Sequence, residues 1–281
     1  MSTRRQTAGS RGCYRGNRAE SKVEQSVPNA RSRAGADVPP RKKPHANRLL
    51  SLLPRAVLES LQPSLQAMTL KAGDTLFAPG DEVTHSYFPL NETVVALIVP
   101  MQDGRAVEAA TVGREGVIGG VISLGYKPAF CFARVQVPGA VLRISLKKLE
   151  AAKLQAPRLH DILARYADCL IAQVLQSVGC ATVHALEART ARWLLTIHDR
   201  LERPDLPLTQ EALAEMLGVA RTYMSRIARS LQKKGAVTYS RGVIRVRNRR
   251  VLEEATCECY DAVRRHFERV LPGAYPASHD G

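Results

Sequence analysis

Apolar residues repeat with two different periods along the chain, which predicts a β-rich segment between helical ones. Seven apolar residues fall at helical spacing in residues 47–67. From Met68 to Ile144, short β-rich runs alternate with turns that carry glycine, such as Asp103-Gly104. The runs are Met68–Leu70, Thr75–Phe77, Ser86–Phe88, Val94–Val99, Ala106–Val112, Cys131–Val137 and Ala140–Ile144. Regular turns between short strands predict an antiparallel sandwich or barrel-like domain.

After Ser145 the spacing becomes helical again. One apolar stripe has a second one beside it, which makes a broad face: Leu159, Leu163, Tyr166, Leu170 and Val174, then Ile162, Ile171 and Val178. Such a face can pair with its twin in a dimer or pack on its own β-domain, and both can hold along one helix. A further helix is predicted over Leu186–Leu201, before Pro204 and Pro207 break the pattern.

Residues 208–232 have the side chains that a helix-turn-helix requires at fixed offsets. With Gln210 as the first position, the fifth is the small Ala214, where the two helices approach closely. The ninth is Gly218, which can adopt the positive φ of a tight turn. Thr209 is a suitable N-cap for the first helix. The apolar contacts between the two helices are expected from Leu213, Met224 and Ile227.

The second helix of this motif, predicted over Arg221–Gln232, is expected to enter the major groove of DNA. Its base-reading residues are expected to be Arg221, Thr222, Tyr223, Ser225 and Arg226, because arginine can donate two hydrogen bonds to guanine. A hairpin of Ala236–Tyr239 and Val243–Val246 forms a wing. Phosphate contacts are expected from Thr209, Arg229, Lys233, Lys234 and the wing-tip Arg241. The alternative is a two-helix surface element with a solvated basic face.

The distribution of charge supports a polyanionic partner. Of the formal net charge of +15, the excess lies in two places. Residues 1–50 carry twelve basic and three acidic residues, and residues 216–250 carry ten basic residues and no acidic one. Such a distribution of charge usually indicates that the protein binds nucleic acid or an anionic membrane surface. Residues 1–44 are predicted to be a disordered basic tail, although their composition also resembles a transit peptide.

Neither a membrane-spanning segment nor an enzyme is expected. The longest apolar run, Val94–Val99, is far shorter than a membrane span, no secretory pattern opens the chain, and a cytoplasmic location is predicted. P-loop, nucleophile-elbow and paired-carboxylate motifs are absent from the sequence, and a pairing of His184 with Glu187 on one helix is interpreted as structural. The six cysteines are scattered, and reduced thiols are expected. Cys257-Glu258-Cys259 with His266 nearby lacks the spacing of a zinc site, so no metal or cofactor is predicted.

A Gly-punctuated β-domain, a long helix and a winged helix-turn-helix, in that order, resemble the Crp/Fnr family of bacterial regulators over about residues 47–250. The resemblance implies an α+β fold with a cyclic-nucleotide-binding-like β-roll, a long dimerisation helix and a C-terminal winged helix-turn-helix. It further implies binding of a palindromic promoter site as a homodimer, with RNA polymerase as a partner. The expected domains are residues 1–44 as the tail, 45–150 as the β-roll, 151–185 as the dimerisation helix, 186–250 as the winged helix-turn-helix and 251–281 as a helical extension.

The same resemblance places a possible effector pocket at Gly119, Gly120, Ala129, Phe130 and Cys131. Members that bind cAMP hold it with a Gly-Glu pair and a later Arg-Ser/Thr pair. Here Gly120 stands in place of the glutamate, and Ala129 and Phe130 stand in place of the second pair. Without the arginine a buried phosphate lacks its main partner, so the effector is unidentified and not expected to be cAMP.

Lys127 as a substitute for the arginine and His85 as a haem ligand remain alternatives. Only Cys13 precedes Cys131, so the N-terminal cysteine cluster of iron–sulfur members is missing. A nucleotide-responsive signalling module whose winged helix binds protein is a second functional class.

Overall fold

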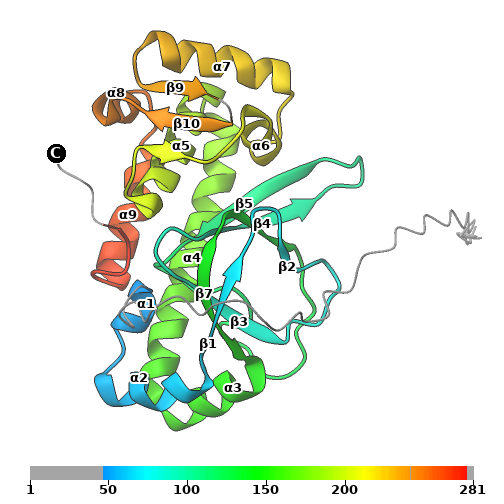
Figure 1. Cartoon of the computed structure of the whole chain (residues 1–281), viewed down its shortest axis with the longest axis vertical. Coiled ribbons are helices and arrows are strands. Elements are labelled where there is room, and N and C mark those ends of the chain that lie inside the picture. The colour runs from blue at the N-terminus through cyan, green and yellow to red at the C-terminus, as the bar shows by residue number, and fades with distance from the viewer. Residues whose placement is uncertain (1–46, 241, 277–281) are drawn as a thin grey trace, which may run out of the picture. The chain divides into compact units, whose positions relative to one another are not determined.

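The computed structural model describes residues 47–240 and 242–276 and has the predicted α+β fold (Figure 1). The basic tail predicted at residues 1–44 and the wing-tip Arg241 lie outside the described residues. Within the described ranges, no helix combines the length and the apolar character that crossing a membrane would require.

The β-roll is built from two antiparallel sheets, and every strand predicted from the sequence is present. The 3-stranded sheet has the order β1-β7-β3 and the 4-stranded sheet the order β2-β6-β4-β5. The strands are β1 (Gln66–Leu70), β2 (Thr75–Phe77), β3 (His85–Pro89), β4 (Val94–Pro100), β5 (Ala106–Val112), β6 (Phe132–Val137) and β7 (Gly139–Ser145). The Asp103-Gly104 turn joins β4 to β5, and Gly104 has the positive φ of 83° that this turn needs.

The segment before the roll is less regular than the continuous helical spacing predicted. It forms α1 (Arg48–Ser51), α2 (Arg55–Leu61) and the 3-10 turn η1 (Gln62–Ser64), and β1 begins at Gln66. Pro54 interrupts the helix because proline lacks the N–H donor and its ring clashes with the preceding turn. The leucines of this segment still enter the core as their spacing predicts, since Leu49, Leu50, Leu53 and Leu61 are buried.

Two helices follow the roll where the residue pattern predicts one over residues 151–185. Helix α3 (Leu146–Gln155) ends before Ala156, and α4 (Pro157–Val183) begins directly after it. Ala156 has an extended backbone because a residue before proline is disfavoured in the helical region. The first half of α4 packs on the roll, with Leu159, Leu163 and Tyr166 at 1% exposure. Its second half presents Ile171, Leu175 and Val178 to solvent at 53%, 66% and 63% exposure.

The C-terminal part contains the winged helix-turn-helix and a helical extension. Helix α5 (Leu186–Leu201) has the predicted bounds. It is followed by β8 (Asp205–Leu206), α6 (Gln210–Met216), α7 (Arg221–Lys233), β9 (Val237–Ser240), β10 (Val243–Val246), α8 (Arg249–Glu254) and α9 (Cys259–Val270). Strand β8 lies between two prolines where only a break was predicted, and it extends the wing to a sheet of order β8-β10-β9. Helix α9 packs along α4.

A buried ion pair connects the roll to the helix that precedes the helix-turn-helix. Arg200 of α5 donates to Glu115, in the turn after β5, with Nε–Oε1 at 2.9 Å, and both side chains are 1% exposed. Arg200 also donates to the carbonyl oxygens of Thr111 and Thr196, each at 2.9 Å. Burial acts to lower the pKa of Arg200, but Glu115, Tyr275 and Asp199 together outweigh it, and the pKa is raised. Arg200 is therefore charged in the folded protein.

Candidate nucleic-acid interface

The turn between α6 and α7 has the geometry that the sequence predicted. Gly218 adopts a φ of 67°, a backbone conformation that residues other than glycine rarely take. The amide of Val219 donates to the carbonyl of Ala214 at 3.0 Å, and Ala214 is 3% exposed, so a larger side chain would not fit between the helices. Thr209 caps α6, with its hydroxyl accepting from the amide of Ala212 at 3.0 Å. These contacts fix α6 and α7 relative to one another.

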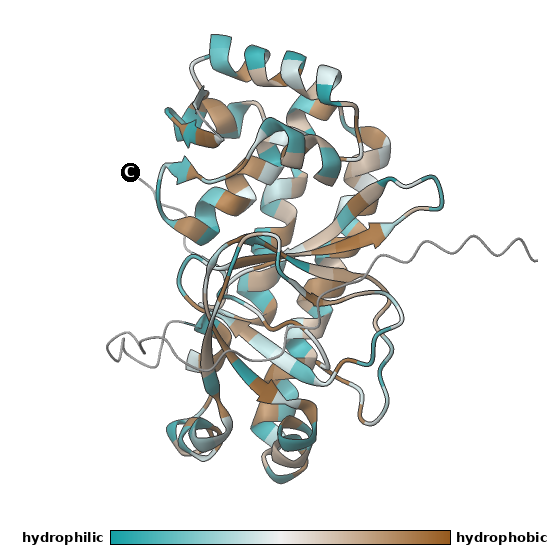
Figure 2. Ribbon diagram, turned by 45° about the vertical axis from the view of Figure 1, so that its right-hand side comes forward, coloured by the Kyte–Doolittle hydropathy of each residue, from teal (hydrophilic) through white to brown (hydrophobic). Residues whose placement is uncertain are grey.

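Helix α7 is strongly two-sided. Its apolar side, formed by Met224, Ile227, Ala228 and Leu231, is buried against the rest of the domain. Its other side is polar, as the hydrophilic colouring on the outer side of this helix shows in Figure 2. The exposed residues there are Arg221, Thr222, Tyr223, Arg226, Arg229, Gln232 and Lys233, four of which are basic. Within residues 47–240 and 242–276, Arg221, Arg226 and Lys233 form no ion pair, so their charges are available to a ligand.

Three of the predicted DNA contacts are already engaged within the protein. Ser225 is half-buried and donates to Gln210 at 3.2 Å. Arg229 is exposed and donates through Nε to the carbonyl of Ser225 at 3.2 Å, which leaves the rest of its guanidinium outward. Lys234 is paired with Glu187 of α5, which also accepts from Ser230 at 2.8 Å. The hydrogen bond from Lys234 holds the pKa of Glu187 below its usual range. The ammonium group of Lys234 would therefore be shared between Glu187 and any phosphate that it contacts.

Sequence reasoning missed the acidic partners of this domain. Glu187 was interpreted together with His184 as one helix face, but His184 lies at the end of α4 and Glu187 in the first turn of α5. On the wing, Arg245 is tied to Asp205 by two hydrogen bonds of 2.5 and 2.7 Å. Neither pairing has a local sequence signal, because each joins residues at least forty positions apart.

The residues expected to form an effector pocket differ in their surroundings. Gly120 has a φ of 58°, and a Cβ atom there would overlap the side chain of Leu146. A Cβ atom at Gly119 would lie 2.6 Å from the carbonyl oxygen of His85. Ala129 is buried, whereas Phe130 is 82% exposed and Cys131 is half-buried. A side chain at Gly120 would therefore meet Leu146.

The two alternative ligand residues are also engaged. Lys127 is buried, pairs with Glu150 and donates to the carbonyl of Gly125 at 2.6 Å, so it does not offer a free charge to a phosphate. His85 is half-buried at the start of β3, and its Nδ1 lies 2.9 Å from the hydroxyl oxygen of Thr84.

A cavity of about 240 Å³ lies elsewhere, between β5, the second half of α4 and α5. Glu108 lines it and accepts hydrogen bonds from Trp193 at 2.9 Å, from Gln136 at 2.6 Å and from Thr111. Burial raises the pKa of Glu108 although these hydrogen bonds act to lower it. Gln136 also donates to the sulfur of Met216 in α6 at 2.9 Å. The cavity therefore borders both the roll and the helix-turn-helix.

Restoring the family's glutamate should not create a cAMP site. We expect Gly120→Glu to bind no cAMP in isothermal titration calorimetry and to lower the free energy of unfolding by about 1–3 kcal/mol. The loss follows from the positive φ and from the overlap with Leu146. Gly104→Glu is the matched control, because Gly104 has a similar φ but open space around it, so its loss should be smaller. Binding of cAMP by Gly120→Glu would contradict the inference that Leu146 leaves no room for a side chain at position 120.

Comparisons with known proteins agree with this architecture. Residues 188–255 match the Crp-like helix-turn-helix domain. The global nitrogen regulator of a Nostoc species is 26% identical over 188 residues, which cover 63% of this chain and 83% of that protein. The structure of FixK2 from Bradyrhizobium japonicum matches with a TM-score of 0.60 at 17% identity. The match covers 69% of this chain and 98% of the FixK2 chain. The c-di-GMP responsive global regulator CLP of Xanthomonas campestris has a TM-score of 0.57 at 16% identity and covers 69% and 99%. Residues 188–255 are therefore a Crp-like helix-turn-helix domain, and the chain has the fold that the structures of FixK2 and CLP show.

Proposed function

We propose that the protein is a sequence-specific DNA-binding regulator that binds a palindromic promoter site as a homodimer. The observation that carries this proposal is the pair Arg221 and Arg226, which stand exposed on the outer side of α7 without an acidic partner among the described residues. A guanidinium held this way can donate two hydrogen bonds to O6 and N7 of guanine.

The other exposed groups of the motif divide into base-reading and phosphate-binding roles. Thr222 and Tyr223 lie beside Arg221 on the first turn of α7, the end that enters the major groove in helix-turn-helix proteins. Ser225 can also read a base if its hydroxyl group gives up the hydrogen bond that it donates to Gln210. Phosphates are assigned to Thr209, Arg229, Lys233, Lys234 and Arg241. Of these, Lys233 is the simplest to test because its ammonium group is exposed and forms no ion pair within the described chain.

The homodimer is supported by the exposed half of α4. Ile171, Leu175 and Val178 follow one another at helical spacing, and all three are more than half exposed. An apolar stripe on a long helix is expected to bury itself against a second copy, as in a two-helix coiled coil. A dimer places two recognition helices on one duplex, which requires two half-sites related by symmetry.

The effector and the downstream partner are inferred less directly. The position filled by Leu146 argues for an effector other than cAMP, and it equally argues against a nucleotide-responsive module as the main function. RNA polymerase is the partner that regulation of a promoter implies, and a cytoplasmic location follows from the proposed role.

Site selection from random duplex DNA tests this proposal. The full chain should recover a palindrome whose half-sites lie about 10–10.5 bp apart, one helical turn of DNA. Leu175→Glu should give a monomer in sedimentation analysis and lose preference for the full palindrome, because a charge in the apolar stripe opposes pairing of the two helices. Lys147→Glu, on α3, is the matched control for an added acidic side chain. Recovery of no common motif, or a palindrome bound equally well by the Leu175→Glu monomer, would overturn the proposal.

A further inference from the structure

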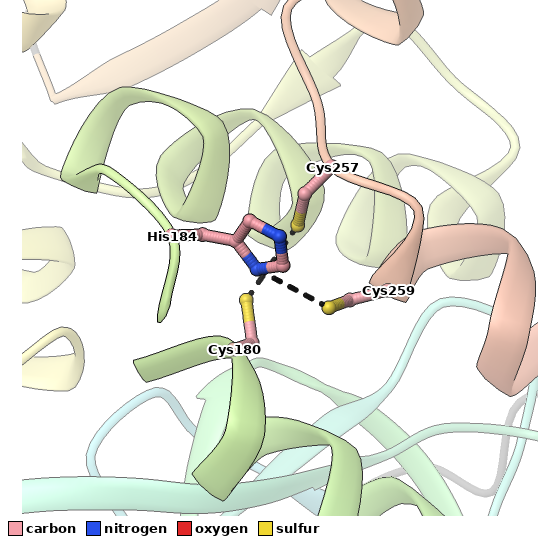
Figure 3. A group of neighbouring side chains, drawn as sticks. All are labelled: Cys180, His184, Cys257 and Cys259. Carbon is pink, nitrogen blue, oxygen red and sulfur yellow. Dashed lines mark hydrogen bonds between the residues drawn. The ribbon is translucent and has the colours of Figure 1, made fainter. Parts of the chain in front are cut away.

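Three cysteines and a histidine come together where the end of α4 meets the turn between α8 and α9. They are Cys180, His184, Cys257 and Cys259, and their Sγ and imidazole nitrogen atoms all lie within 4.8 Å of one another (Figure 3). The three thiols are buried, at 0%, 7% and 1% exposure, and His184 is half-buried. Two segments that are more than seventy residues apart in sequence therefore direct four soft or borderline ligands at one point.

Local structure explains how each segment presents two ligands. Cys180 lies in the last turn of α4, and His184 follows the end of that helix, with its amide donating to the carbonyl of Cys180 at 3.1 Å. A spacing of four residues brings both side chains to the same side. Cys257 and Cys259 flank Glu258 at the start of α9, where the amide of Tyr260 donates to the carbonyl of Cys257 at 3.1 Å. The packing of α9 along α4 then closes the group.

We propose that these four residues bind a structural Zn²⁺ ion in a tetrahedral Cys₃His site. Zinc binds thiolate sulfur at about 2.3 Å and imidazole nitrogen at about 2.0–2.1 Å, so a tetrahedron around it has S···S edges of about 3.8 Å and S···N edges of about 3.6 Å. The Sγ atoms of Cys180 and Cys257 are 3.6 Å apart. Sγ of Cys259 and Nδ1 of His184 are 3.5 Å apart. Two opposite edges of the group thus already have the lengths that zinc requires.

The surroundings of the group suit a metal centre better than they suit simple packing of thiols. Nδ1 of His184 faces the cysteines, while its Nε2 lies 3.2 Å from Oε1 of Glu258. A histidine that binds metal through one nitrogen commonly donates from the other to a carboxylate, which orients the ring. Gln176 of α4 donates to Sγ of Cys259 at 3.0 Å, and such a donor stabilises a thiolate. Binding of Zn²⁺ would replace the thiol protons, which pass to solvent.

Other outcomes for the same group are distinguishable by chemistry. In an iron–sulfur cube each thiolate binds a different iron, which separates the sulfur atoms more widely than the ligands of a single ion. A disulfide between Cys180 and Cys257 would require their sulfur atoms to move from 3.6 Å to about 2.05 Å. His266, which the sequence placed near the C-x-C pair, is not a member of the group. The second ligand pair comes instead from α4, which local spacing does not reveal.

The experiment uses the full chain, purified under reducing conditions, and does not involve DNA. Metal analysis by mass spectrometry should find zinc in equimolar amount with the chain. Replacement by Co²⁺ should give the intense visible absorption of a tetrahedral ion with thiolate ligands. Cys259→Ser and Cys180→Ala should lose both signals. Cys131→Ser is the matched control, because Cys131 lies outside the group, and it should keep them.

A second variant keeps the test informative if loss of a ligand unfolds the protein. Glu258→Gln removes only the carboxylate that orients His184, on a side chain that is 75% exposed. It should weaken zinc binding by about 10- to 100-fold in a competition with a chromogenic chelator. Zinc-free protein in which Cys180, Cys257 and Cys259 all react as free thiols, a Cys180–Cys257 disulfide in place of a metal, or the visible absorption of an iron–sulfur cluster would each overturn the proposal.

Discussion

Replacing Glu115 by alanine is expected to lower the free energy of unfolding by about 3–5 kcal/mol, as measured by urea denaturation. The change leaves the guanidinium of Arg200 charged at 1% exposure, without the carboxylate that now accepts from it at 2.9 Å. The carbonyl oxygens of Thr111 and Thr196 and the ring of Tyr275, 5.5 Å from the guanidinium carbon, offer only partial compensation. The cost is therefore that of an unpaired buried charge.

Two controls separate this cost from a general effect of losing a carboxylate. Glu59→Ala breaks a pair with Arg55 whose side chains are 57% and 91% exposed, and it should cost about 0–1 kcal/mol. The double variant Glu115→Leu with Arg200→Met removes both charges and should recover much of the loss. A cost for Glu115→Ala no larger than that for Glu59→Ala would show that the ion pair does not stabilise the junction between the roll and α5.

Arg226→Ala is expected to weaken binding to the selected palindrome by about 1–3 kcal/mol, or roughly 5- to 150-fold in Kd. It should also relax preference at a single base position of each half-site, because the lost contact is to a base edge. The measurement is a titration of fluorescent duplexes that differ at one position. Arg55→Ala, which removes the same charge from exposed α2, is the control and should change little.

Lys233→Ala provides the contrasting result on the same helix. If its ammonium group binds a phosphate, the variant should weaken binding to all sequences alike and reduce the slope of log K against log salt by about 1. An Arg226→Ala variant that behaved like Lys233→Ala would assign Arg226 to the phosphate backbone instead of to a base.

The parts of the structure that depend on local spacing could be predicted from the sequence. The strands of the roll, helix α5 and the helix-turn-helix follow from residue period, turn glycines and the small Ala214. The two breaks at Pro54 and Pro157 were missed because the apolar spacing continues through both prolines. Proline's effect on its own and the preceding residue decided the local structure at both points.

Features that depend on contacts between distant segments could not be predicted. Nothing local to Glu115 indicates that it will meet Arg200 across 85 residues. The pairing of Glu187 with Lys234 likewise needs α5 and α7 to be placed first. The cysteines appeared scattered because Cys180 and Cys257 are adjacent only after α9 has packed on α4. The filled position at Gly120 depends on where α3 begins, since Leu146 is its first residue.

Helix α4 is divided between two tasks at about its midpoint. Residues such as Leu163 complete the interior of their own subunit, whereas Leu175, three turns further on, faces outward. Substitutions in the first half are expected to be tolerated only if the subunit still folds. In the proposed homodimer, substitutions at the exposed Ile171, Leu175 and Val178 are expected to change the strength or the choice of association while the subunit stays folded. Quaternary structure and tertiary structure could then vary independently along a single element of the chain.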